Sequence, residues 1–247
     1  MSLPPIGVLC GGVATRLGPI AGELPKSLVP VAGEPFLAHQ LRRLARRGFS
    51  RVVLLVGYRG GQIRAFAGDG RRFGIEVVYS DDGDTRLGTG GAVRNALPQL
   101  GDRFFVTYGD SLLDVDPVVM WQCFCDGDAS AMMAVFHNCD RWGQSNVVFD
   151  GTRVRCHDKA VTAGLLKPEW IDWGMTIFTA ETIRDWPEAD PFDLATVTKH
   201  LAATGRLSGF PVDNRFYEIG SPASLAETEA FLTAGGAPLP RRTETSC

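Results

Sequence analysis

The stretch Val8-Leu-Cys-Gly-Gly-Val-Ala-Thr-Arg-Leu-Gly18 decides the fold of this 247-residue chain. The apolar run at residues 6–10 is long enough for a buried strand and too short to span a membrane. The two glycines that end it, Gly11 and Gly12, allow a sharp turn and a close approach of the backbone to a ligand. Taken alone, a Gly-Gly pair is more typical of an ordinary turn between a strand and a helix.

Polar and cationic residues after the glycines change this interpretation. Thr15 and Arg16 come next, and the guanidinium of Arg16 is a planar donor group that fits a phosphate. Lys26 adds a second cation directly after Pro25, which stiffens the start of this segment. Exposed backbone N–H groups in a row also form an anion-binding concavity. Together these features predict a polyphosphate site at the carboxyl end of the first strand.

Strands and helices alternate along the first half of the chain. The β-branched run at 52–56 is typical of a strand covered on both faces, and residues 34–47 have the apolar spacing of an amphipathic helix. This alternation predicts a three-layer α/β fold with a doubly wound, mainly parallel sheet. Further strands are expected at 75–79, 104–108, 131–136, 174–179, 207–212 and 215–219, and further helices at 62–67, 92–100, 116–124, 182–186 and 192–203.

The second half of the chain is expected to be more antiparallel. Residues 146–156 place Asp150-Gly151 between two β-rich arms, which is the strongest hairpin signal in the sequence. Ser221-Pro222 supplies an N-cap and a first-turn proline for a last helix. We expect a single domain over residues 1–234 and a flexible tail over 235–247.

Composition and charge limit the classes of function. A net charge of −3 argues against a nucleic-acid-binding surface, and no apolar stretch approaches membrane-spanning length. The N-terminus lacks a secretory signal, and the six cysteines show no metal-binding spacing, so we expect reduced thiols. These observations predict a cytoplasmic protein without nucleic-acid or membrane partners. The sequence leaves open whether the protein forms a homo-oligomer.

Acidic residues follow two further predicted strands. Asp110 comes after the strand at 104–108, and Glu218 ends a late strand. Ligands of open parallel sheets bind beyond the carboxyl ends of the strands. Asp110 is therefore a candidate ligand for Mg²⁺, which takes one or two carboxylates plus phosphate oxygens and waters. A role as a helix or turn cap explains Asp110 equally well. Glu218 is the best candidate for a second carboxylate ligand of the metal.

Two other segments can supply ligand contacts. Leu87-Gly-Thr-Gly-Gly-Ala92 follows the third strand and opens a helix, so its amides can approach a ring or a phosphate. Lys159 follows the predicted hairpin as an isolated cation. By itself, Lys159 is more typical of a solvated surface lysine than of a ligand.

Taken together, these segments resemble the sugar-1-phosphate nucleotidylyltransferases, also called NDP-sugar pyrophosphorylases. The family signature, Gly-Gly-x-Gly-Thr-Arg-Leu followed by Pro-Lys-x-Leu-x-Pro, stands here as Gly11-Gly-Val-Ala-Thr-Arg-Leu17 and Pro25-Lys-Ser-Leu-Val-Pro30. Later matches, in the family's order, are Gly88-Thr-Gly-Gly-Ala92, Gly109-Asp110, Arg141-Trp-Gly143, Asp158-Lys159, Gly174 and Glu218-Ile-Gly-Ser-Pro222. Within the family, residues 84–92 and 108–115 look most like the guanylyltransferases acting on D-glycero-D-manno-heptose 1-phosphate.

The resemblance implies a Rossmann-like nucleotidyltransferase fold with a sugar-binding second half. It implies an enzyme of the EC 2.7.7 type that joins a nucleoside triphosphate, with GTP favoured, to a heptose-like sugar 1-phosphate and releases pyrophosphate. The implied catalytic residues are Arg16, Lys26 and Asp110. The implied nucleotide-binding residues are Leu9, Gly11, Gly12, Thr15, Arg16, Gly88, Gly91 and Asp110. The implied sugar-phosphate-binding residues are Gly143, Asp158, Lys159 and Gly174, and the implied ligands of the Mg²⁺ cofactor are Asp110 and Glu218.

The sequence departs from the family pattern at two positions. Ala14 stands where the family often has glycine, and Glu218 stands where an aspartate is usual. Glutamate is one methylene longer than aspartate, so the metal would shift or the backbone would recede. Alanine in place of glycine at position 14 is a small change that a less strained loop can absorb.

Other classes of protein stay open. The short length also suits uridylyltransferases for N-acetylmuramate 1-phosphate and enzymes for other sugar or cyclitol phosphates. A nucleotide-sugar glycosyltransferase typically shows Asp-x-Asp after the fourth strand, whereas this chain has Asp110-Ser-Leu-Leu-Asp114. A non-catalytic nucleotide-sugar sensor would be expected to lose Arg16, Lys26 or Asp110, and all three are present.

Overall fold

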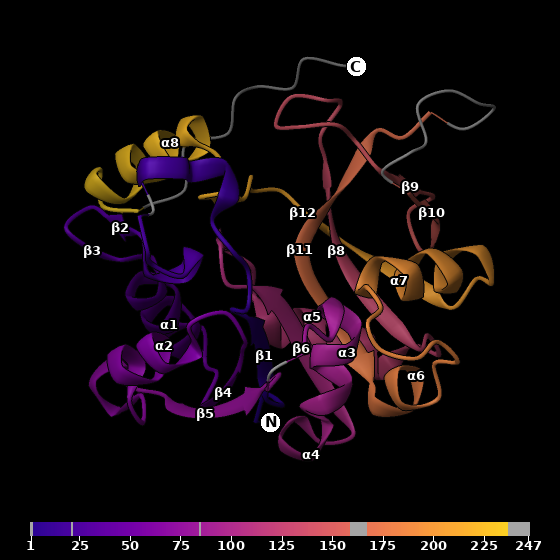
Figure 1. Cartoon of the computed structure of the whole chain (residues 1–247). Helices are drawn as coiled ribbons and strands as arrows, with labels where there is room; N and C mark the ends of the chain where they lie inside the picture. Colours follow the sequence, from indigo (N-terminus) through magenta and orange to yellow (C-terminus); the bar gives the residue numbers. More distant parts are fainter. Residues whose placement is uncertain (1, 21, 84, 159–166, 237–247) are drawn as a thin grey trace.

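The computed structural model describes residues 2–20, 22–83, 85–158 and 167–236. Its framework is one mixed sheet with the strand order β10-β9-β11-β6-β1-β4-β5, in which β8 pairs with β11 and with β12. Helices cover both faces of this sheet (Figure 1). The structure therefore confirms the predicted three-layer α/β architecture.

The first half of the sheet is parallel. Strand β1 (Ile6–Leu9) lies between β4 (Arg51–Val56) and β6 (Arg103–Tyr108), and β4 pairs with β5 (Glu76–Asp81). Residues 52–56 are at most 1% exposed, as expected for a β-branched strand between two layers of helices. Because these strands run parallel, their carboxyl ends meet at one edge of the sheet.

The second half is largely antiparallel, as predicted. Strand β11 (Trp170–Thr179) runs antiparallel to β6 and to β8 (Ala131–His137). Strands β9 (Val147–Phe149) and β10 (Val154–His157) form the predicted hairpin. Strand β12 (Leu207–Val212) is an exception, because it pairs with β8 in parallel.

The helices divide between two hydrophobic cores. On one face, α1 (Phe36–Arg46), α2 (Gly60–Ala67) and α5 (Pro117–Asp126) pack on the sheet. The other face carries four helices and the second core. These helices are α3 (Gly88–Asn95), α4 (Leu97–Leu100), α6 (Ala180–Arg184) and α7 (Leu194–Ala203).

A third, smaller core joins the chain's two ends. Helix α8 (Pro222–Thr233) begins at the N-cap Ser221, which forms a capping box with Ser224. The helix lies beside the 3₁₀ helix η1 (Thr15–Ile20) and carries Phe231 into the core (Figure 1). The remaining short elements are η2 (Lys26–Leu28), β2 (Pro30–Val31), β3 (Glu34–Pro35), η3 (Arg71–Phe73), β7 (Ser111–Leu112) and β13 (Tyr217–Glu218).

Several predicted boundaries differ from the structure. The helix expected at 92–100 begins at Gly88 and is interrupted at Ala96, so it forms α3 and α4. The strand expected at 215–219 is reduced to β13. Nearly all of the predicted tail lies outside the described residues, and the single domain over 1–234 stays a prediction.

The cysteines require one correction. Cys10, Cys123, Cys125 and Cys156 are free thiols, but Cys139 is disulfide-bonded. The expectation of six reduced thiols is therefore wrong, because spacing along a sequence does not tell which cysteines meet in space. The thiols thus no longer support the cytoplasmic prediction. In the described ranges, no helix has both the length and the apolar character that crossing a bilayer requires.

Candidate active site

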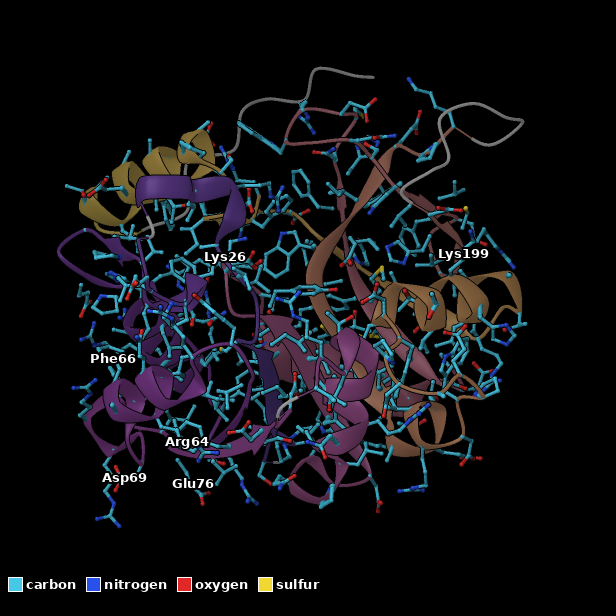
Figure 2. All side chains as sticks on the ribbon, in the orientation of Figure 1. Lys26, Arg64, Phe66, Asp69, Glu76 and Lys199 are labelled. Carbon is cyan, nitrogen blue, oxygen red and sulfur yellow. The ribbon has the colours of Figure 1, made fainter. Side chains whose placement is uncertain are left out.

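Lys26 and Asp110 lie at the centre of the candidate site. Lys26 begins η2, in the upper middle of Figure 2, and Asp110 lies in the turn between β6 and β7. The Nζ of Lys26 donates a hydrogen bond to Oδ2 of Asp110, and the side chains are 13% and 25% exposed. Residues 84 positions apart in the sequence are thus in direct contact. A cation beside a carboxylate that can bind metal suits a reaction in which negative charge develops on a phosphate.

Gln40 holds the turn that carries Asp110. This α1 side chain is 3% exposed, and its Nε2 donates to the carbonyls of Tyr108 at 2.7 Å and Ser111 at 2.8 Å. The Ser111 hydroxyl also donates to Asp110 Oδ1 at 3.2 Å. The backbone on both sides of Asp110 is therefore tied to a buried side chain, which limits where the carboxylate can point.

A short strand pair places Glu218 near Asp110. Glu218 lies opposite Ser111 in the pairing of β13 with β7, and the N–H of Ile219 donates to the carbonyl of Asp110 at 3.1 Å. The Glu218 carboxylate accepts the N–H of Gly220 at 3.0 Å. Among the described residues, no group of three or more His, Cys, Asp or Glu could hold a metal ion. Two carboxylates nevertheless fit a Mg²⁺ ion whose remaining ligands are phosphate oxygens and water.

The loop after β1 has an open backbone. Nothing lies within 4 Å of the position that a Cβ of Gly12 would take. A Cβ of Gly11 would make only ordinary contacts, at 3.5 Å from Gly57 N and 3.7 Å from Asp82 Oδ2. Neither residue has a positive φ. Crowding and backbone conformation therefore do not require glycine at either position, and the backbone there is open to the approach of a ligand.

The other residues predicted around the nucleotide surround this loop. Leu9 ends β1, and its carbonyl accepts the N–H of Gly109 at 3.0 Å. Thr15 opens η1, and Arg16 is exposed on the same element. Within the described ranges, the Arg16 guanidinium forms no hydrogen bond or ion pair, so it is accessible to an anionic ligand.

Asp82, a residue that the sequence analysis did not single out, faces the glycine loop. It directly follows β5, and its Oδ1 atom is buried without a hydrogen-bond donor in the described structure. Burial raises the pKa of the Asp82 carboxyl to about 6, and the negative charges of Asp81 and Asp190 add to this effect. A desolvated carboxylate that lacks a donor is suited to bind N–H groups of a ligand.

Gly88 and Gly91 are explained largely by packing within the protein. A Cβ at Gly88 would overlap the backbone of Phe192, and a Cβ at Gly91 would overlap the carboxylate of Asp190. The carbonyl of Phe192 accepts the N–H groups of Gly90 at 2.9 Å and Gly91 at 3.4 Å. Those two amides are already used, and among the three glycine amides of this segment only that of Gly88 makes no hydrogen bond within the described residues.

The residues predicted to bind the sugar phosphate lie in the second half of the sheet. Gly143 has a φ of 124°, and its carbonyl accepts a hydrogen bond from Asn138 Nδ2 at 2.7 Å. Asp158 Oδ2 lies 2.5 Å from the Nζ of Lys199, which sits on α7 at the right of Figure 2. Lys159 lies outside the described residues. The structure thus pairs Asp158 with Lys199 on α7, and the predicted sugar-phosphate contact of Asp158 stays a prediction.

Gly174 lies in an irregular part of β11. The pairing of β11 with β8 shifts its register between Asp172 and Thr176, and Gly174 has a φ of 92°. Its N–H donates to Asp172 Oδ1 at 2.8 Å, and its carbonyl accepts from Thr107 Oγ1 at 2.9 Å. Bulges of this kind redirect side chains beside active sites. Here the bulge requires glycine and fixes the orientation of Asp172.

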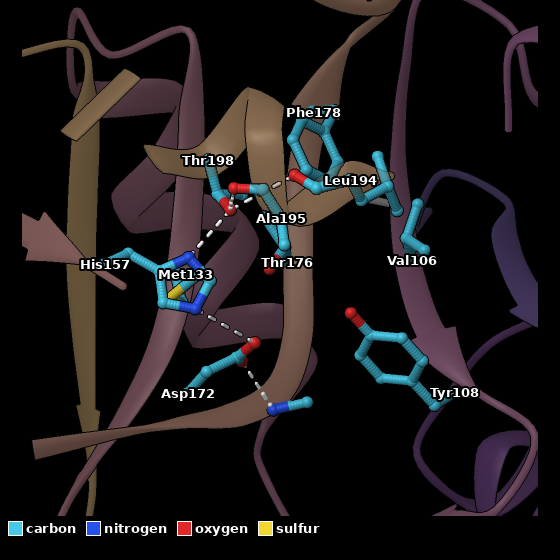
Figure 3. Close-up of a pocket in the computed structure, with 11 residues that line it drawn as sticks. Val106, Tyr108, Met133, His157, Asp172, Thr176, Phe178, Leu194, Ala195 and Thr198 are labelled. Atoms are coloured by element: carbon cyan, nitrogen blue, oxygen red, sulfur yellow. Dashed lines mark hydrogen bonds and ion pairs between the residues drawn. The ribbon is translucent and has the colours of Figure 1, made fainter. Parts of the chain in front are cut away.

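A cavity opens beside this bulge (Figure 3). Its accessible volume is about 20 Å³. The hydroxyl of Tyr108 points into it from one side, and His157 and Asp172 lie on the other. His157 Nδ1 lies 2.8 Å from Thr198 Oγ1, and His157 Nε2 lies 3.9 Å from Asp172 Oδ2. A space of this size holds about one water molecule.

Several residues that shape this site were not predicted from the sequence. A sequence signal for Asp82 was available, because Asp82 follows the third strand as Asp110 follows the fourth. Ligands of open parallel sheets bind beyond the carboxyl ends of the strands, which applies to both residues. Gln40 sits on the buried face of a helix, and His157 and Asp172 belong to strands. No sequence pattern distinguishes these three residues from ordinary structural ones.

Comparison with known proteins identifies the family. The family model described as the MobA-like NTP transferase domain matches residues 6–163. An N-acetylmuramate alpha-1-phosphate uridylyltransferase of Neisseria meningitidis is 36% identical over 116 residues, which are 47% of this chain and 50% of that protein. A D-glycero-alpha-D-manno-heptose 1-phosphate guanylyltransferase of Campylobacter jejuni is 26% identical over 215 residues, 87% of this chain and 94% of that protein.

A solved structure supports the same fold. The crystal structure of HddC from Yersinia pseudotuberculosis complexed with GMP-PN has a TM-score of 0.77 and 23% sequence identity, covering 93% of this chain and all of that one. Together with the match to residues 6–163, this similarity confirms the nucleotidyltransferase fold that the resemblance implied. The matched segment includes the glycine loop, Lys26 and Asp110, and the chain belongs to the family of MobA-like NTP transferase domains.

Proposed function

We propose that this protein transfers a nucleotidyl group from a nucleoside triphosphate to a sugar 1-phosphate and releases pyrophosphate. The contact of Lys26 with Asp110 beside the open glycine loop carries this proposal, because it joins phosphate-binding and metal-binding groups at one point. The relatives from Neisseria meningitidis and Campylobacter jejuni are named for this type of reaction. The family match favours this reaction over glycosyl transfer.

The reaction needs little beyond positioning and neutralisation of charge. The oxygen of a sugar 1-phosphate is already an anion, so it can attack the α-phosphorus without a general base. Arg16 and the glycine-loop amides would hold the phosphates, and Lys26 would stabilise the charge that develops at the α-phosphate. Lys159 would neutralise the acceptor phosphate, as the resemblance implies.

The carboxylates near Lys26 suit a divalent metal, for which we propose Mg²⁺. Asp110 and Glu218 would hold it, and the substrate phosphates would supply further oxygen ligands. The metal would neutralise negative charge on the triphosphate. Since Lys26 contacts Asp110 directly, its ammonium group would share this carboxylate with the metal or turn toward the phosphate when the nucleotide binds.

Asp82 supports GTP as the nucleotide. Guanine presents an N–H and an amino group side by side, and a carboxylate can accept from both at once. Uracil presents one N–H between two carbonyl oxygens, which a carboxylate would repel. The Oδ1 atom of Asp82 is buried without a donor in the described structure, and Oδ2 lies beside Gly11 and Gly57, so this carboxylate fits guanine better. The neighbouring structure solved with GMP-PN is consistent with this choice.

Pyrophosphate release tests the function directly. The protein is incubated with Mg²⁺, with GTP, UTP, CTP or dTTP, and with a panel of sugar and cyclitol 1-phosphates. We expect release that depends on both substrates and is fastest with GTP and a heptose 1-phosphate. Asp82→Asn should lower the ratio of kcat/KM for GTP to that for UTP. A complete lack of release with every pair would favour the non-catalytic sensor instead.

We further propose that the protein acts in the cytoplasm without nucleic-acid or membrane partners. The composition supports this placement, and so does the dependence of the reaction on nucleoside triphosphates. A homo-oligomer also stays a prediction, which the elution volume in size-exclusion chromatography tests.

A further inference from the structure

We propose that Arg215 is a positioning residue that holds the acceptor loop, residues 138–143, against strand β13. The loop ends at Gly143, for which a sugar-phosphate contact is predicted, and β13 carries Glu218, the proposed second metal ligand. This inference rests on the proposed function and goes beyond it, since it names a residue that sets where the sugar 1-phosphate lies relative to the metal.

The two segments that meet at Arg215 lie at the edge of the sheet that carries the candidate site. Strand β8 runs antiparallel to β11, and β11 runs antiparallel to β6, so β8 points in the same direction as β6 and β1. Strand β12 is parallel to β8. The acceptor loop follows the carboxyl end of β8, and residues 213–216 follow that of β12. Both segments are therefore placed to border ligands, which bind beyond this edge of the sheet.

The guanidinium group of Arg215 contacts two aromatic rings. Its Cζ atom lies 3.6 Å from the centroid of the Trp142 ring and 4.5 Å from that of the Tyr217 ring. A planar guanidinium stacks well on an aromatic face, and the attraction between cation and ring adds to the packing. Trp142 directly precedes Gly143, and Tyr217 directly precedes Glu218. One side chain thus joins the acceptor loop to the metal-binding strand.

The segment around Arg215 is itself firmly anchored. Arg215 Nη2 donates to Glu227 Oε2 on α8 at 2.6 Å, and the Arg215 side chain is 19% exposed. The carbonyl of Asn214 accepts a hydrogen bond from Nε1 of Trp173 at 2.6 Å, and Trp173 is 1% exposed in β11. Because the backbone and the guanidinium are both held, Arg215 offers the acceptor loop a fixed surface.

Strand β13 has supports that do not depend on Arg215. It pairs with β7, and Thr228 Oγ1 on α8 donates to the carbonyl of Glu218 at 2.7 Å. The Tyr217 ring also stacks on Phe231 with 3.9 Å between the ring centroids. Trp142, in contrast, is 39% exposed, and its ring loses its stacking partner when Arg215 is removed. Removal should therefore free the acceptor loop and leave the metal-binding strand in place.

The first test measures both substrates of Arg215→Ala. Pyrophosphate release with Mg²⁺ is followed while GTP and an accepted sugar 1-phosphate are varied in turn. We expect kcat/KM for the sugar 1-phosphate to fall by about 10–100-fold, the effect of a small misplacement of a reacting group. The KM for GTP should stay constant. An unchanged kcat/KM for the sugar 1-phosphate would overturn this inference, and so would an equally large rise in the KM for GTP.

The second test separates positioning from direct binding of the acceptor phosphate by the charge of Arg215. Arg215→Lys keeps the positive charge and loses the planar group that stacks on the rings. It should lower kcat/KM for the sugar 1-phosphate nearly as much as Arg215→Ala does. Full activity of Arg215→Lys would show that the charge alone is needed and would overturn the positioning role.

A double variant tests whether Trp142 and Arg215 act as one unit. Trp142→Ala should lower kcat/KM for the sugar 1-phosphate as Arg215→Ala does, and the double variant should be little worse than either single one. Fully additive losses would show that the two side chains act independently and would contradict the proposed contact.

Arg72→Ala is a matched control. The Cζ atom of Arg72 lies 4.4 Å and 4.6 Å from the ring centroids of Phe66 and Phe73, so this arginine also stacks on two rings. It belongs to η3, just before the amino end of β5, and therefore lies at the opposite edge of the sheet. Figure 2 shows the neighbouring Glu76 far below Lys26. Arg72→Ala should leave the kinetic constants for both substrates unchanged.

Failure of this inference differs from failure of the proposed function. If the unmodified protein released no pyrophosphate with any sugar 1-phosphate, the proposed function itself would be contradicted. If the unmodified protein is active and Arg215→Ala uses the sugar 1-phosphate normally, only the role of Arg215 is wrong. Circular dichroism spectra that match those of the unmodified protein establish that each variant is folded.

Discussion

At the scale of single residues, Lys26 has the most direct chemical role. Its ammonium group contacts Asp110 and lies in a partly buried position, where its charge is less screened than in bulk water. Its place after Pro25 was visible in the sequence, but its contact with Asp110 was not. The residue connects the glycine-loop segment to the strand end that carries Asp110, the proposed metal ligand.

We expect Lys26→Ala to lower kcat by about 10²–10³, the range for loss of one charge-stabilising group in a transition state. The KM for the nucleoside triphosphate should change much less, because Arg16 and the loop amides still bind its phosphates. Steady-state pyrophosphate release at several nucleotide concentrations gives both constants. A variant with unchanged kcat would contradict the role of Lys26.

Asp82 provides a test based on pH. Its carboxyl pKa is raised to about 6, chiefly by burial, so the folded protein favours the protonated form more than the unfolded chain does. The stability that protonation provides is present at low pH and is lost as the pH rises through about 6. The neutral amide of Asp82→Asn cannot ionise, so the variant keeps its stability as the pH rises. Asp82→Asn should therefore raise the melting temperature at pH 8 more than at pH 4.5. The exposed Asp126→Asn should show no such difference between the two pH values.

At the scale of secondary-structure elements, helix α3 shows how packing overrides local preference. Its first turn contains three glycines, which are poor helix formers. The segment 190–192 lies so close to this turn that side chains at Gly88, Gly90 and Gly91 would collide with it. From the sequence, this glycine segment is expected to contact a ligand, because a glycine that faces a ligand and one that faces a packed loop look alike in a sequence.

Replacing each of two helical glycines by alanine should therefore change the stability of the protein in opposite directions. A Cβ at Gly90 would overlap the ring of Phe192, whereas a Cβ at Gly61 in α2 meets nothing within 4 Å. Gly90→Ala should lower the free energy of unfolding by about 1–3 kcal/mol through overpacking. Gly61→Ala should raise it by about 0.5–1 kcal/mol through helix propensity. Urea denaturation monitored by circular dichroism measures both, and equal effects would contradict this account of α3.

At the scale of the whole molecule, the site depends on elements from both ends of the chain. The β7–β13 pair brings Glu218 beside the segment that carries Asp110, and α8 packs over η1 of the glycine loop. A nucleotide bound with its metal would contact both regions at once. Binding should therefore stabilise the folded state as a whole.

We expect GTP with Mg²⁺ to raise the melting temperature, because a ligand that binds only the folded state adds about 2.7 kcal/mol at 100 times its Kd. EDTA should remove most of this shift, since the proposed metal would link the phosphates to Asp110 and Glu218. Thermal unfolding with GTP, with and without EDTA, measures it. Glu218→Gln should reduce the effect of Mg²⁺, and an unchanged shift would exclude Glu218 as a ligand.

The sequence by itself determined the fold class, the order of the elements and the reaction class. These follow from local patterns: hydrophobic runs with helical or strand periodicity, and a glycine loop followed closely by Arg16 and Lys26. Only the tertiary structure decided which distant residues meet, such as Gln40 with the turn around Asp110, or Tyr108 with His157 and Asp172. Register, bulges and the packing of α3 set these contacts, and they depend on interactions across the sheet that no local pattern records. The chemistry was therefore readable along the chain, whereas the choice of base and sugar depends on how the chain is folded.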